Sequence, residues 1–127
     1  MHHKFRFTAS RFNATESEAL VARLRDGLIE AASEAEISDP IRQGSGWGFW
    51  LDIGGDRYWA YAGAAEGQEN KPTDLEWLAG IEGHEPAFVR LHETRARRQE
   101  RFDGLVAALR TLIAADSGVE LLAEEDD

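Results

Sequence analysis

The chain of 127 residues contains no cysteine, which excludes disulfide bonds, thiolate metal sites, iron–sulfur clusters and cysteine nucleophiles. It has no apolar run near the roughly 18 residues of a membrane span, and residues 1 to 6 lack the apolar stretch of a secretory signal. Basic residues are few, because 14 lysines and arginines stand against 24 aspartates and glutamates. We therefore expect a cytoplasmic protein that binds no membrane and whose charge repels nucleic acid.

Motifs for catalysis or cofactor binding are also missing. The glycine-rich residues 44 to 48 precede a strand pattern and are followed by no Gly-Lys-Ser/Thr, so they do not form a phosphate-binding loop. His84 and His92 are each followed by glutamate, but they are eight residues apart with Pro86 between them, so a shared helical face is not assured. We expect no catalytic residue, no cofactor and no metal site.

Hydrophobic periodicity predicts alternating strands and helices along the chain. Phe5 and Phe7 alternate with polar residues, which is typical of a strand with one buried face, and leucines at helical spacing follow a capping box. Residues 64 to 73 are polar and predict a loop, while both ends of the chain, residues 1 to 3 and 124 to 127, are expected to be flexible. The predicted elements are a strand at 4 to 8, a helix at 16 to 35, strands at 47 to 53, 57 to 62 and 75 to 82, a helix best defined at 102 to 113, and a strand at 119 to 123.

The strongest local signal is a hairpin around Gly54 and Gly55, which tolerate the positive φ angles of a two-residue turn. Such a turn pairs Ile53 with Asp56, Asp52 with Arg57, Leu51 with Tyr58, Trp50 with Trp59 and Gly48 with Tyr61. Gly48 then leaves room beside Tyr61. A three-residue turn would instead direct Trp59 and Tyr61 toward the core, because a shift of one residue exchanges the two faces of a strand.

This order of elements predicts an α+β fold in a single domain over residues 1 to 127. An antiparallel meander sheet would form one layer and the two helices would cover one of its faces. The other face carries Trp50 and Trp59, and large exposed apolar patches mark binding or dimer surfaces. Alternatively, residues 64 to 73 or 84 to 98 fold over this face.

Three hypotheses for function follow. The first is a non-catalytic, acidic protein-binding module for a basic partner, with binding residues Trp50, Trp59, Tyr61, Asp52 and Asp56. The second is a homodimeric structural or accessory protein that pairs through the same face. The third is a small-ligand or enzymatic pocket between sheet and helices. Arginines gathered in residues 90 to 110 either bind an anionic group or form ion pairs with neighbours on the helix.

Three segments carry a resemblance to known proteins. The runs GWGFWLDIGGDRYWAYAG, LEWLAGIEG and ALRTLIAADSGVELL resemble small uncharacterised bacterial α+β proteins, over residues 47 to 122. The compact acidic domain without catalytic motifs is also similar to immunity proteins that neutralise basic bacterial toxins. This resemblance implies a protein partner and transfers no individual functional residue.

Overall fold

The computed structural model describes residues 1–9, 16–44, 46–53, 56–65, 75–84, 95–115 and 118–126. These form two helices and seven strands in an order close to that predicted from sequence. The elements are β1 (His2–Ala9), α1 (Ser17–Ala31), β2 (Glu36–Ile37), β3 (Ile41–Gln43), β4 (Gly46–Ile53), β5 (Asp56–Ala64), β6 (Glu76–His84), α2 (Arg95–Ala114) and β7 (Val119–Asp126).

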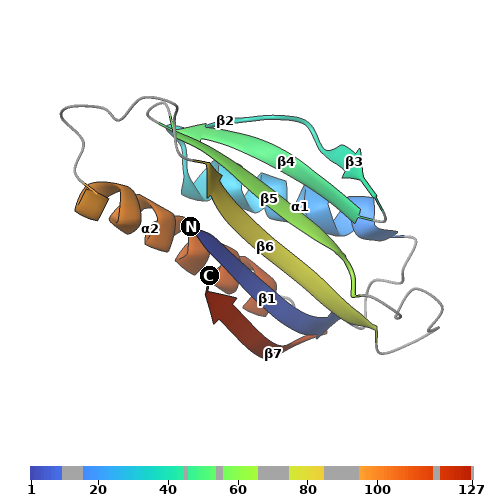
Figure 1. Ribbon diagram of the computed structural model, residues 1–127. Helices are drawn as coiled ribbons and strands as arrows, with labels where there is room; N and C mark the ends of the chain where they lie inside the picture. The colour runs from blue at the N-terminus through green and yellow to red at the C-terminus, as the bar shows by residue number, and fades with distance from the viewer. Residues whose placement is uncertain are drawn as a thin grey trace.

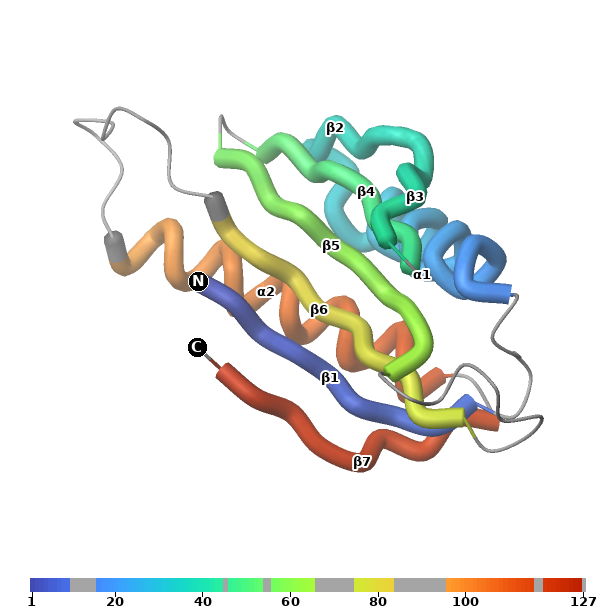
Figure 2. The backbone as a smooth tube through the Cα atoms, turned by 45° about the vertical axis from the view of Figure 1, so that its right-hand side comes forward, coloured from blue at the N-terminus to red at the C-terminus, as the bar shows by residue number. Residues whose placement is uncertain are grey.

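All strands belong to one sheet, in the order β2-β4-β5-β6-β1-β7, with β3 also paired to β4. Every pairing is antiparallel. Both helices pack on the same face of this sheet, so the molecule has two layers (Figures 1 and 2). The predicted α+β sandwich is therefore confirmed.

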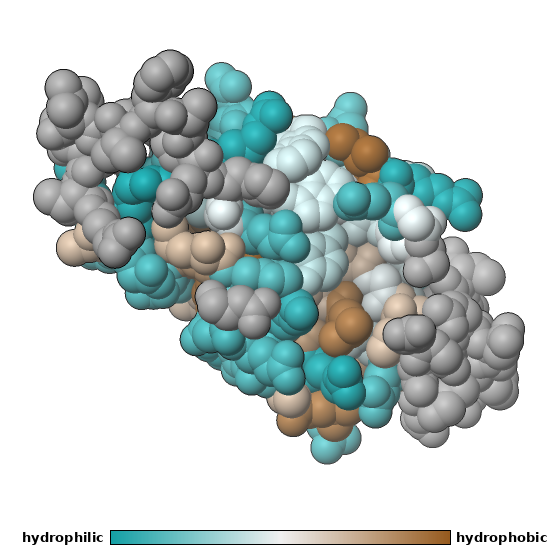
Figure 3. Space-filling model, viewed as in Figure 1, coloured by the Kyte–Doolittle hydropathy of each residue, from teal (hydrophilic) through white to brown (hydrophobic). Residues whose placement is uncertain are grey.

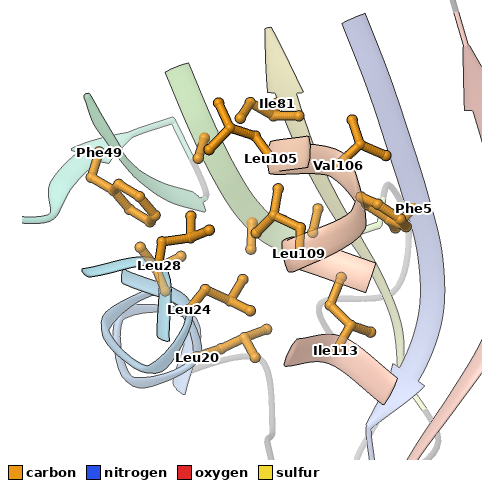
Figure 4. Close-up of a cluster of buried hydrophobic side chains, with 14 of the residues drawn as sticks. Phe5, Leu20, Leu24, Leu28, Phe49, Ile81, Leu105, Val106, Leu109 and Ile113 are labelled. Atoms are coloured by element: carbon orange, nitrogen blue, oxygen red, sulfur yellow. The ribbon is translucent and has the colours of Figure 1, made fainter. Parts of the chain in front are cut away.

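The hydrophobic core fills the space between the two layers. Leucines at helical spacing on α1 and α2 meet aromatic and branched side chains of the strands (Figure 4). Buried members from the helices include Leu20, Leu24, Leu28, Leu105, Leu109 and Ile113, and those from the sheet include Phe5, Phe49 and Ile81. Burial of each such side chain contributes about 1.5–3 kcal/mol relative to an exposed one. This core fixes one face of the sheet against the helices.

The hairpin between β4 and β5 has the register that a two-residue turn predicts. Trp50 is paired with Trp59, and Ile53 is paired with Asp56 across the turn. The turn residues themselves, 54 and 55, lie outside the described residues. Tyr58 is buried in the core, whereas its neighbour Trp59 belongs to the opposite face.

The first helix is shorter than predicted, because α1 ends at Ala31 and the chain then runs back along β4 as two edge strands. Ser38 joins this edge to β4 twice: its N–H donates to the Trp50 carbonyl, and its side-chain oxygen accepts from the Trp50 N–H. From the pair Ile37–Leu51 to the pair Ile41–Gly48 the edge advances by four residues and β4 by three, so one extra residue divides the edge into two short strands. Most of the predicted loop at residues 64 to 73 lies outside the described residues.

Both ends of the chain pair in the sheet, contrary to the expected flexibility. β1 begins at His2 and β7 continues to Asp126. His3 is 6% exposed and its ring hydrogen-bonds to Glu124, at 2.9 Å, and to Asp126. Polar contacts therefore hold the two ends together, although residues 122 to 126 are exposed to solvent, as the charged tail predicts.

Candidate functional site

The face of the sheet opposite the helices, here called the open face, is covered by neither helix (Figure 1). Residues that face each other in the register share a face, which assigns side chains to it. Across β4, β5 and β6, the open face carries Gly46, Gly63 and Leu78 in one row, Gly48, Tyr61 and Gly80 in the next, and Trp50, Trp59 and Glu82 in the third. Figure 3 views this face, where pale and brown surface lies between hydrophilic teal surface.

The centre of the open face is the Trp50–Trp59 pair. The ring centroids are 4.7 Å apart and the ring planes are inclined by 51°. Trp59 is only 8% exposed, whereas Trp50 is half-buried. Arg57 extends over the Trp50 ring at 5.0 Å from its centroid, and its Nε donates to Asp52 Oδ1 at 3.1 Å. A cation–π contact and an ion pair thus hold one guanidinium at the edge of the aromatic pair.

Tyr61 occupies the next row and is held by the start of the chain. His2 Nε2 lies 2.8 Å from the Tyr61 hydroxyl oxygen and 3.5 Å from a carboxylate oxygen of Glu82. β1 therefore places His2 where it fixes the positions of both groups. The alternating pattern of residues 75 to 82 predicts that Glu82 points away from the core. The position of His2 beside Glu82 follows only from the order of strands in the sheet.

Glycines on the open face allow the aromatic rings to lie close to the sheet. A Cβ on Gly48 would overlap the Trp59 ring, and a Cβ on Gly80 would overlap the Tyr61 ring. Gly48 therefore makes room for Trp59, the diagonal neighbour, although Tyr61 is its partner in the register.

Beside these rings lies a hollow of about 360 Å³, here called the aromatic hollow. Its lining includes Gln43, Trp59, Tyr61, Gly63, Leu78 and Glu82. Gly46 and Gly63 both line the hollow, and a Cβ on Gly46 would overlap the Ala62 carbonyl oxygen of β5. Gln43 reaches it from the edge strand β3, which is too short for its sequence to show a periodic pattern.

Charge on the open face is mainly negative. Its acidic side chains are Glu36, Asp52, Glu76, Glu82, Glu120 and Glu125, and its basic side chains are Lys4, Arg6 and Arg57. Arg6 and Arg57 lie within ion-pair distance of Glu76 and Asp52. The aromatic centre is thus surrounded by an excess of carboxylates.

Asp56, which the sequence had grouped with the aromatic residues, lies on the helix side of the sheet and is 3% exposed. Arg101 donates to its Oδ2 at 2.7 Å, and Arg98 Nε lies 3.4 Å from the same oxygen. Burial and the Asp56 charge raise the pKa of the neighbouring Tyr58. Two arginines of α2 are therefore directed into a buried ion cluster, and Asp56 is not available to a partner on the open face.

A second hollow, of about 420 Å³, lies between α2 and the ends of β1 and β7, and His3, Asp103, Arg110 and Asp126 line it. Its polar groups already interact with protein groups: Arg110 donates to Glu124 at 2.8 Å, and Gln99 donates to Asp103 at 2.9 Å. No side chain among its described lining residues carries a hydroxyl or thiol. The Arg110–Glu124 hydrogen bond connects α2 to β7 of the sheet.

The His3 ring lies at the centre of that network. Burial alone would lower the pKa of His3, but hydrogen bonds to Asp126 and Glu124 and the charges of both carboxylates raise it above its ordinary value of 6.5. The hydrogen bond from Arg110, with a further contribution from His3, lowers the pKa of Glu124. Both pKa shifts favour the charged forms of His3 and Glu124, which connect β1 to β7.

Neither the family models nor the curated proteins contain a match to this chain. Within the described segments, no group of three histidine, aspartate or glutamate side chains is arranged to hold a metal ion. In that same part of the chain, neither helix is long and apolar enough to cross a membrane. His92, one half of the histidine pair considered from sequence, lies outside the described residues. The open face is therefore the feature of the molecule that bears on function.

Proposed function

We propose that this chain is a non-catalytic protein-binding module that covers a basic partner with its open face, in the manner of an inhibitor or immunity protein. The observation that supports this proposal is the aromatic group of Trp50, Trp59 and Tyr61 at the centre of a face that neither helix covers. Carboxylates outnumber basic groups around it, and the whole chain has a formal net charge of −10.

An aromatic centre surrounded by charged residues is typical of protein interfaces. Aromatic anchors near the centre supply most of the binding energy when they are desolvated, and charges at the rim direct the encounter and select the partner. Trp50 and Tyr61 keep part of their surface exposed, while Trp59 supports them from below. Asp52 and Glu82 stand beside the rings as acidic neighbours.

The same charges disfavour the alternative in which the open face pairs with a second copy. Two identical acidic faces repel each other, and each copy carries the full net charge. Pairing through the β7 edge of the sheet is also disfavoured, because β7 carries Glu120, Glu124, Glu125 and Asp126, and charged edge strands resist the addition of further strands.

Affinity capture from a lysate of the source organism tests the proposal when it is performed with matched variants. We expect the wild-type chain to retain a basic protein at low salt and to release it at high salt. Trp50→Ala and Asp52→Lys should lose that protein. Ile29→Ala should keep it, because Ile29 is a large apolar residue, 42% exposed, that lies on α1 in the other layer.

Circular dichroism and thermal unfolding must first show that each variant is folded. Capture that persists in both Trp50→Ala and Asp52→Lys would overturn the proposal. Sedimentation showing a dimer that Trp50→Ala dissociates would also overturn it, in favour of the homodimeric alternative.

A further inference from the structure

We infer that the aromatic hollow receives an arginine side chain of the partner. This inference rests on the proposed function, because it names the chemical group by which a basic protein would be recognised on the open face.

The size of the hollow suits one side chain. Small-molecule pockets span roughly 300–1,000 Å³, and the aromatic hollow, at about 360 Å³, is near the lower limit. Gly46 and Gly63 line it with backbone, and Leu78 adds an apolar surface beside them. A long side chain could lay its aliphatic part against Leu78 and bring its polar end to the rings.

The chemistry of the lining selects a cation. Trp59 and Tyr61 present two aromatic rings, and Glu82 adds a carboxylate that is 39% exposed. Aromatic rings attract cations, and a carboxylate adds a charge-assisted hydrogen bond. Arginine fits this combination better than lysine, because the guanidinium is planar, stacks on aromatic rings and donates two parallel hydrogen bonds to one carboxylate.

The open face already holds one guanidinium in this way. Arg57 lies over the Trp50 ring at 5.0 Å and donates to Asp52 at 3.1 Å. In the aromatic hollow, Trp59 and Tyr61 take the place of that ring, and Glu82 takes the place of that carboxylate.

The acceptor groups are also positioned in advance. His2 hydrogen-bonds to the Tyr61 hydroxyl at 2.8 Å and lies 3.5 Å from Glu82, so the ring and the carboxylate are held at the same rim. Groups whose positions are fixed before binding lose little conformational freedom when a ligand arrives.

A short peptide provides the test. Acetyl-Gly-Arg-Gly-amide is titrated into the ¹⁵N-labelled chain, and acetyl-Gly-citrulline-Gly-amide, which has nearly the same shape without the charge, serves as the control ligand. We expect the arginine peptide to shift the backbone signals of Gly63, Leu78 and Glu82 and the Trp59 indole signal. The citrulline peptide should bind at least roughly tenfold more weakly, because it loses the charge-assisted contacts.

Matched variants distinguish the effect of the Glu82 carboxylate from the effect of the overall negative charge. Glu82→Gln should weaken binding of the arginine peptide roughly tenfold, because a carboxylate is replaced by a neutral amide. Glu120→Gln changes the net charge equally on the same face, but on β7, and should leave binding within about twofold. Equal affinity for the citrulline peptide, or equal loss in both variants, would overturn the inference.

The lysate capture distinguishes the two proposals. If Trp50→Ala abolishes capture but the arginine peptide does not bind in the hollow, the inference fails and the proposed function stands. If the peptide binds in a Glu82-dependent way but capture does not depend on the open face, the hollow remains a guanidinium site and the proposed function fails.

Discussion

Replacement of Asp56 by asparagine tests how the helical layer is held on the sheet. Asp56→Asn keeps the shape of the side chain but removes the charge that faces Arg98 and Arg101. The Asp56 side chain is 4% exposed, and those of Arg98 and Arg101 are 15% and 18% exposed. The substitution therefore leaves two largely buried guanidinium groups without their common carboxylate.

The size of the effect follows from this burial. Removal of one partner from a buried ion pair costs about 3–5 kcal/mol. Arg98 and Arg101 keep some contact with water, so we expect the lower end, about 3 kcal/mol, which is a large part of the roughly 5–15 kcal/mol stability of a typical domain. For a chain of this length the melting temperature should fall by roughly 10 °C.

Urea unfolding followed by tryptophan fluorescence measures this difference directly. Asp52→Asn is the matched control, because it makes the same chemical change on the same hairpin but on the open face, where Asp52 and Arg57 are 39% and 56% exposed. An exposed pair contributes only about 0.2–1 kcal/mol. If Asp56→Asn costs no more than Asp52→Asn, the buried cluster does not hold α2 on the sheet and this reasoning is wrong.

Two further predictions concern the ends of the chain and the glycines of the open face. Because the folded-state pKa of His3 is raised above 6.5, its stabilising contribution is complete below that value and is lost as the pH rises through the folded pKa. The stability difference between the wild-type chain and His3→Gln, measured by urea unfolding, should therefore be larger at about pH 5.5 than at about pH 8.5. A difference that grows with pH would contradict the contacts of charged His3 with Glu124 and Asp126. Gly80→Ala should destabilise the fold by about 1–3 kcal/mol, because its Cβ overlaps the Tyr61 ring. Gly104→Ala lies on α2 with open space around it and should instead stabilise the fold by roughly 0.5–1 kcal/mol. Equal effects of the two substitutions in thermal unfolding would refute the packing of Tyr61 on Gly80.

The hairpin was predictable because local rules determine it. A two-glycine turn and alternating residues are enough to set the register, and the pairs Trp50–Trp59 and Asp52–Arg57 follow. The same register also places Asp56 on the side of Tyr58, toward the helices. The sequence interpretation places Asp56 on the binding surface as an electrostatic neighbour of the aromatic residues. Its counter-charges, Arg98 and Arg101, lie more than 40 positions away in the sequence, so no local pattern reveals the buried cluster.

Other features depend on the order of strands in the sheet, which local patterns do not determine. His3 has the same parity as Phe5, which indicates an inward position, but its acceptors Glu124 and Asp126 come from the opposite end of the chain. Gln43 reaches the aromatic hollow from a strand of three residues, too short to show a period. The aromatic centre of the candidate site was therefore visible in the sequence, and most of its surroundings were not.

Chemical-shift mapping of the ¹⁵N-labelled chain, on addition of the purified basic protein from the capture, tests the central claim most directly. We predict that the indole signals of Trp50 and Trp59 shift together with backbone signals of β4, β5 and β6, while those of the exposed side of α1 around Ile29 stay in place. Shifts confined to α1 and α2, with both indole signals unchanged, would contradict the assignment of the open face as the binding surface.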